Sequence, residues 1–154
     1  MATGNLQYRK MIESDVSLIK AFTTFDSLWK SIEMDALTAK EYINKYVLGE
    51  WRVWQQNNKD VAITYHLDHA PSNNKPWLGT VIINPNDRRQ GFGTQVVKQL
   101  KKELREKGHK AIFAGVPVEA DIWIQFMSDC YFEQFKIEKD DQNQMFLIMV
   151  SPLQ

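Results

Sequence analysis

The chain has 154 residues, and its 19 basic and 19 acidic side chains give a formal net charge of zero. The length fits one compact domain over residues 1–154, and the balanced charge argues against a nucleic-acid binder, which would carry a basic excess. The single cysteine, Cys130, excludes an internal disulfide and a cysteine-only zinc site, and the three histidines lack a metal-binding spacing, so we expect no bound metal.

The first half of the chain predicts three strands and two helices. Residues 6–11 alternate and predict a strand, and apolar residues at helical spacing predict a helix over 16–25. Residues 38–46 predict a second helix, with Thr38 as cap and Glu41 three residues later. Residues 51–55 and 61–67 predict a hairpin around the polar turn 56–59.

The second half predicts four strands and two helices. Residues 77–83 form an apolar run between two prolines, and 93–107 form an amphipathic helix with a basic last turn before Gly108. Residues 111–116 predict a strand, and 119–128 predict a helix with Ile122 and Phe126 facing inward and Trp123 as a further candidate. Residues 132–138 and 145–150 predict a last strand pair, which offers an edge for a homodimer if the protein is not a monomer.

This order of elements predicts an α/β protein with a three-layer α+β arrangement. About seven strands form a mostly antiparallel, mixed, twisted sheet flanked by about four helices. The longest apolar run, 145–150, is too short to span a bilayer, and the first residues lack the apolar core of a signal peptide. We therefore expect a cytoplasmic protein that is not attached to a membrane.

The segment 81–97 combines a strand, a short basic loop with two glycines, and the start of a helix. The first turn of a helix leaves backbone N–H groups unpaired and carries a partial positive charge, so it suits a phosphate. Glycines at 91 and 93 allow a sharp turn and a close approach, and Arg88 and Arg89 add charge. The alternative is a glycine-rich turn that only redirects the chain, because the segment is neither a Walker A loop nor a Rossmann fingerprint.

The stretch Pro85-x-x-Arg88-Arg89-Gln90-Gly91-Phe92-Gly93 resembles the acetyl-CoA signature of the GNAT N-acetyltransferase superfamily, [RQ]-x-x-G-x-[GA]. An apolar strand and a proline three residues before the arginine precede that signature, as they do here. The predicted element order is also similar to the GNAT fold over nearly the whole chain. The resemblance implies an N-acetyltransferase that uses acetyl-CoA as co-substrate and acetylates a primary amine of a small molecule or a peptide.

The resemblance also implies roles for particular positions. Val81 to Ile83 would pair with the pantetheine arm, the Ile83 N–H would polarise the thioester carbonyl, and the following loop would hold the pyrophosphate. The implied cofactor-binding residues are Val81, Ile82, Ile83, Arg88, Arg89, Gln90, Gly91, Phe92, Gly93 and Thr94. Because the amine would attack the thioester directly, Cys130 is not expected to act as a nucleophile.

The match weakens at the proton donor. In the family a tyrosine on the next helix commonly reprotonates the thiolate, and Met127 holds that position here. Ser128 is the neighbouring hydroxyl, with Cys130 and Tyr131 close in sequence, and water is a further alternative. The general base is not assigned, and its candidates are His66, Asp68, Glu50, Glu33 and Asp35. His66 could instead be a strand residue with its hydrogen bonds satisfied. Glu33 and Asp35 could instead be solvated surface carboxylates.

In the family the region between the first two helices borders the acceptor site. Trp29, Glu33 and Trp51 are therefore expected to bind a substrate with an apolar body and a cationic amine. Trp51 and Trp54 point to opposite faces of their strand, so at most one of them is expected to line a cleft. Two other functions remain open: a non-catalytic acetyl-CoA-binding module, favoured by Met127, and an unrelated phosphate-binding domain.

Overall fold

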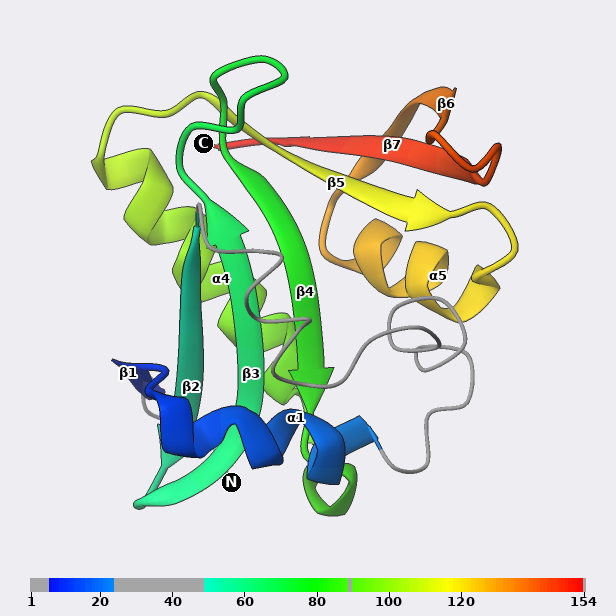
Figure 1. Cartoon of the computed structure of the whole chain (residues 1–154). Coiled ribbons are helices and arrows are strands. Elements are labelled where there is room, and N and C mark those ends of the chain that lie inside the picture. Colours follow the sequence, from blue (N-terminus) through cyan, green and yellow to red (C-terminus); the bar gives the residue numbers. More distant parts are fainter. Residues whose placement is uncertain (1–5, 24–48, 89, 154) are drawn as a thin grey trace. The chain divides into compact units, whose positions relative to one another are not determined.

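The computed structural model describes residues 6–23, 49–88 and 90–153 (Figure 1). The expected helix 38–46, together with Trp29, Glu33, Asp35 and Arg89, lies outside these residues. The elements in chain order are β1 (Gln7–Lys10), η1 (Glu13–Asp15), α1 (Val16–Thr23), β2 (Glu50–Gln56), β3 (Lys59–Leu67), β4 (Trp77–Ile83), η3 (Pro85–Asp87), α4 (Phe92–Glu106), β5 (Ala111–Pro117), α5 (Asp121–Asp129), β6 (Glu133–Lys139) and β7 (Met145–Pro152).

The seven strands form one sheet in the order β1-β2-β3-β4-β5-β7-β6. Adjacent pairs β1–β2, β2–β3, β5–β7 and β6–β7 are antiparallel, whereas β4 and β5 run parallel in the register Trp77↔Phe113 and Leu78↔Ala114. A parallel pair needs a crossover connection, and α4 supplies it. The predicted fold class is confirmed. The expected dimer edge falls on β6, whose residues are all exposed, and the oligomeric state stays a prediction.

Contacts within the chain divide it into two compact units, Met1–His66 with Thr80–Val96 and Leu67–Gly79 with Val97–Gln154. Strand β4 and helix α4 each begin in one unit and end in the other. The basic loop and the first turn of α4 lie entirely in the first unit. The expectation of a single functional domain over residues 1–154 stays a prediction.

The core of the first unit is built around Trp54, which is 1 % exposed. Its indole Nε1 donates to Thr64 Oγ1 at 2.7 Å, so the buried polar atom is satisfied. The predicted hairpin turn is confirmed at Asn57 and Asn58, whose φ angles of 53° and 66° match the two-residue turn that follows the strand twist. Phe92, the first residue of α4, belongs to the same core cluster, so packing fixes where that helix begins.

In the second unit, Leu100 and Leu104 of α4 are fully buried, and Met127 is the buried residue of α5. The prediction that Ile122 faces inward is wrong, because its side chain is 81 % exposed. The side chain of Met127 is buried, and Trp123, Ile124 and Phe126 are half-buried, so Phe126 and Trp123 are partly covered as expected.

Helices α4 and α5 end in the same backbone motif. His109 N–H donates to Leu104 O at 3.1 Å, and Phe132 N–H donates to Met127 O at 3.0 Å. The residue before each donor has a positive φ, 94° at Gly108 and 68° at Tyr131. None of the described helices is both long enough and apolar enough to cross a membrane.

Candidate functional site

The loop after β4 begins with an asparagine that caps it. Asn84 Oδ1 accepts from Asn86 N at 3.1 Å, and Asp87 N donates to Asn84 O at 2.8 Å, which closes the short turn η3. Pro85 at the first position of this turn has a φ that suits it and lacks an N–H that would otherwise need a partner. These contacts give the loop a defined shape directly before Arg88.

Gly91 makes the bend between the loop and α4. Its φ is +81°, a conformation that costs any side-chain-bearing residue free energy, and a Cβ built on it would meet no atom of the described chain within 4 Å. Gln95 N donates to Gly91 O at 3.0 Å, which is the first hydrogen bond of the helix. Among the described residues, the space in front of Gly91 is therefore open. The backbone N–H groups of the first helical turn have no partner within the helix.

The charges around this bend favour an anion. Arg88 is exposed, and the first turn of α4 contains no acidic residue. Gln90 and Thr94 are also exposed, so their side chains can reach a ligand. Phe92 and Gly93 are buried, so they could contribute only backbone groups. Arg89 lies outside the described residues.

The strand that leads into the loop is mostly covered. Val81 and Ile82 are buried, and Ile83 is half-buried against the core cluster of the first unit. Their roles toward a pantetheine arm therefore concern the backbone and stay predictions.

A carboxylate that sequence reasoning missed lies inside the loop. Asp87 is 5 % exposed, and its Oδ1 accepts from Lys59 Nζ at 2.7 Å. Asn84 was also missed. Its N donates to Val61 O at 2.9 Å, and its Nδ2 donates to Asp60 O at 3.1 Å. The Asn-Pro pair at 84–85 is a turn signal that could have pointed to this cap, whereas nothing local pointed to Lys59.

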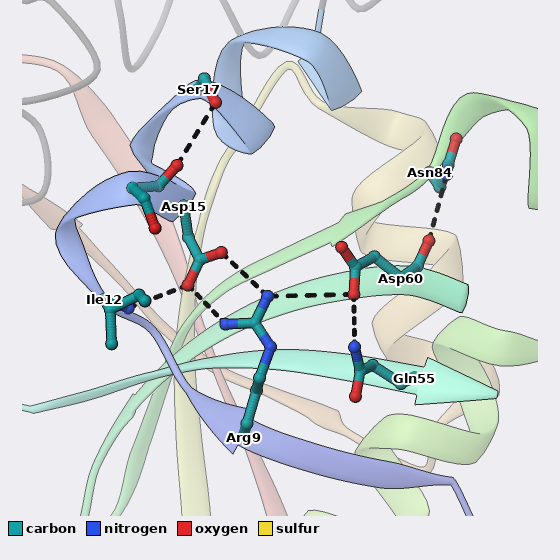
Figure 2. A network of polar contacts seen from close by, with 8 residues as sticks. Arg9, Ile12, Asp15, Ser17, Gln55, Asp60 and Asn84 are labelled. Atoms are coloured by element: carbon teal, nitrogen blue, oxygen red, sulfur yellow. Dashed lines mark hydrogen bonds and ion pairs between the residues drawn. The ribbon is translucent and has the colours of Figure 1, made fainter. Parts of the chain in front are cut away.

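Figure 2 shows how the hairpin end continues into a polar network. Asp60 Oδ1 accepts from Gln55 Nε2 at 2.7 Å and lies 4.0 Å from an Arg9 guanidinium nitrogen. Arg9 donates to both oxygens of Asp15 at 2.5 and 2.8 Å, and Asp15 also accepts from Ile12 N at 2.9 Å. The hydrogen bond from Arg9 lowers the pKa of Asp15 and raises the pKa of Arg9.

The expected acceptor and base residues have mixed placements. Trp51 is 8 % exposed and packs on Tyr65 with ring centroids 4.8 Å apart, and burial raises the pKa of Tyr65. Trp54 is also buried in the core. His66 is 2 % exposed and lies opposite Glu50 in the β2–β3 register. The roles of Trp51 and His66 stay predictions, and Trp29 and Glu33 lie outside the described residues.

The expected proton donor lies in the second unit. Ser128 is an exposed residue of α5, whereas Met127 beside it is 4 % exposed. Cys130 is buried at the end of this helix, where its carbonyl oxygen accepts from Lys101 Nζ at 3.0 Å. Lys101 Nζ also lies 2.7 Å from Ser151 Oγ, and burial lowers the pKa of this lysine. These contacts indicate that Cys130 has a structural role at the end of α5.

Comparisons with known proteins show the family and the fold of the chain. Residues 69–121 match a family model described as FR47-like protein. The uncharacterized protein YkzC of Bacillus subtilis (strain 168) is 47 % identical over 128 residues, which cover 82 % of this chain and 89 % of that protein.

Solved structures share the fold at low sequence identity. An acetyltransferase from Thermus thermophilus gives a TM-score of 0.76 at 17 % identity, covering 99 % of this chain and 100 % of that one. A GNAT family acetyltransferase from Elizabethkingia anophelis with acetyl-CoA bound gives 0.72 at 13 % identity, covering 98 % and 100 %. The chain thus belongs to one family with YkzC, and it has the fold of the GNAT acetyltransferase structures.

Proposed function

We propose that this protein is an N-acetyltransferase that moves an acetyl group from acetyl-CoA to a primary amine of a small molecule or a peptide. The observation that carries the proposal is the bend at Gly91, with its positive φ and open front, between the exposed Arg88 and a helix start without acidic residues. Such a site suits the pyrophosphate of coenzyme A, because backbone N–H groups and a guanidinium can bind it together.

The proposed reaction is a direct displacement at the thioester. The amine nitrogen forms a bond to the acetyl carbon, the carbon–sulfur bond breaks, and the thiolate leaves with the electron pair. The backbone N–H of Ile83 would donate to the thioester oxygen as negative charge develops there. The amine must lose a proton before it attacks and the thiolate gains one afterwards. His66 and Ser128 stay the proposed base and acid.

The amine acceptor is proposed from the resemblance to the superfamily and from three residues. Trp51 lies on β2 and packs on the buried Tyr65, so only the small exposed part of its ring would contact the apolar body of an amine substrate. Trp29 and Glu33 complete the proposed set, with Glu33 as the partner of a cationic amine.

A second function is favoured by one observation. Met127, at the position where the superfamily commonly places its tyrosine, is 4 % exposed and cannot donate a proton. A module that binds acetyl-CoA without transferring its acetyl group would need no donor there.

The first test is ligand-dependent stability. A ligand that binds only the folded protein raises its melting temperature with concentration, so acetyl-CoA should raise it more than ATP does. Arg88→Gln should weaken acetyl-CoA binding by about tenfold, the size of a lost charge-assisted contact, whereas Arg105→Gln at the other end of α4 should not. Equal stabilisation by acetyl-CoA and ATP would indicate an unrelated phosphate site.

The second test is turnover. Release of the CoA thiol is followed with acetyl-CoA and a panel of polyamines, amino acids and peptides with free N-termini, against a control without amine. Amine-dependent release supports the transferase. Tight binding of acetyl-CoA without release from any amine would replace it with the binding module.

A further inference from the structure

A buried negative charge lies within the loop that is proposed to bind a polyanion. Asp87 directly precedes Arg88, and its side chain is 6 % exposed. One carboxylate oxygen accepts from Lys59 Nζ at 2.7 Å, and the other is buried with no hydrogen-bond partner among the described residues. An uncompensated carboxylate here would be costly to bury and would oppose the positive field of Arg88.

Lys59 reaches Asp87 from a turn that is 28 residues away in sequence. It is the first residue of β3, directly after the two-residue turn, and its side chain is 57 % exposed, in contrast to the buried carboxylate that it contacts. The turn conformation at 57–58 therefore sets the position from which the ammonium group approaches the loop.

Two further contacts join the same hairpin end to the loop. Asn84 donates through its backbone N to Val61 O at 2.9 Å and through Nδ2 to Asp60 O at 3.1 Å. Asp60 is itself held by Gln55, as Figure 2 shows. The loop is thus attached at Asn84 by neutral hydrogen bonds and at Asp87 by an ion pair, with Arg88 and Gly91 directly beyond the second attachment.

We propose that Lys59 and Asp87 are a positioning pair with two effects on the anion site. The ion pair tethers the loop to the β2–β3 hairpin, and Lys59 cancels the charge of the buried carboxylate so that Arg88 and the start of α4 retain their attraction for a diphosphate. The second effect rests on the proposed function for its ligand, whereas the tether does not.

The variants separate charge from tether. Lys59→Met removes the ammonium group from a half-exposed side chain and keeps its approximate length, so the fold should be retained. Lys59→Arg keeps the charge, Asp87→Asn removes the carboxylate charge, and the double variant Lys59→Met/Asp87→Asn removes both charges. Lys102→Met, on an exposed position of α4, is the matched control for the change in net charge.

The affinity for CoA is measured by calorimetry at low and high salt. Lys59→Met should weaken binding about tenfold at about 50 mM salt and less at about 500 mM, because salt screens the exposed charges. The double variant should bind CoA with an affinity within about threefold of that of the unchanged protein. Lys59→Arg and Lys102→Met should bind CoA as tightly as the unchanged protein. A double variant as weak as Lys59→Met, or a salt-independent loss, would overturn the charge effect.

Hydrogen exchange in the ligand-free protein tests the tether without any ligand. The amides of Asn86 and Asp87, which are hydrogen-bonded within the turn, should exchange at least several times faster in Lys59→Met and unchanged in Lys102→Met. Unchanged exchange would overturn the tether. If the unchanged protein binds no CoA, both the proposed function and the charge effect are wrong. The tether is then tested by the hydrogen-exchange result alone.

Discussion

The beginnings of α4 and α5 differ in how their unpaired N–H groups are treated. Helix α5 starts after Ala120, which provides no side-chain cap, but Asp121 places a carboxylate in its first turn. Helix α4 starts after a glycine with positive φ and has no acidic residue in its first turn. A carboxylate near a helix start partly neutralises the positive potential that would otherwise attract an external anion. Because the first turn of α4 has no carboxylate, its positive potential can attract a ligand. The helix is slightly less stable as a result.

At the start of α1, Asp15 ends the turn that precedes the helix. Its carboxylate accepts from Ile12 N and from Arg9, and the first turn of α1 contains no acidic residue. Of the three described α-helices, α5 alone therefore has an acidic residue in its first turn, and α4 is the one preceded by Arg88.

Thr94→Asp should have the largest effect, because it gives α4 the feature of α5. The added carboxylate at an exposed first-turn position should stabilise the helix by about 0.3–1 kcal/mol and weaken CoA binding by more than about tenfold. Urea unfolding and calorimetry measure the two quantities. Thr94→Asn is the control without the charge. A variant that binds CoA as tightly as the unchanged protein would show that this helix start does not hold the anion.

Gly91→Ala and Gly108→Ala compare two glycines of similar conformation. Gly91 and Gly108 have φ angles of 81° and 94°, and a Cβ on either meets nothing within 4 Å. Each alanine variant should therefore lose about 1 kcal/mol of unfolding free energy from the left-handed backbone alone. Only Gly91→Ala should also weaken CoA binding, by about tenfold, because its Cβ enters the space where the ligand approaches. Equal affinities in the two variants would argue against a close approach at Gly91.

Tyr131→Gly compares the ends of the two helices. Tyr131 has the left-handed conformation that Gly108 has at the end of α4, and its ring is 80 % exposed, so little packing is lost with it. The variant should gain about 1 kcal/mol, measured by urea unfolding. Its ring lies 5.8 Å from Lys101 Nζ, and Tyr131→Ala, which loses the ring but keeps the strain, is the control. No gain for glycine over alanine would mean that the backbone is not strained there.

Asp15→Asn should have the smallest effect, a loss of stability at neutral pH that disappears in acid. The pKa of Asp15 is lowered in the folded protein by its hydrogen bond to Arg9. Its contribution to stability is therefore complete above the unfolded pKa of about 3.9 and is lost as pH falls through the lower folded value. The unfolding free energy of the variant should depend less steeply on pH below about 4. Parallel curves for the two proteins would contradict the lowered pKa.

Local sequence was enough to predict the seven strands, the hairpin turn at Asn57 and Asn58, and the helix start at the glycine pair. These features depend on alternation, helical spacing and the conformations of asparagine, glycine and proline, which neighbouring residues carry themselves. The inward face of α5 was wrong at Ile122, because a short helix with mixed polarity has two nearly equal apolar faces and packing chooses between them.

Residues 81–97 alone show a basic, glycine-containing loop that leads into a helix, and this points to an anion at Arg88 and Gly91. How the loop is held became visible only in the folded chain. Lys59 and Asp87 are 28 residues apart in the chain, and the residues next to each of them in sequence do not indicate that the two form an ion pair. Burial of Asp87 depends on the hairpin packed beside it, and no periodicity of the sequence records such a contact. The loop was therefore predicted as a binding element, whereas its support was found only in the fold.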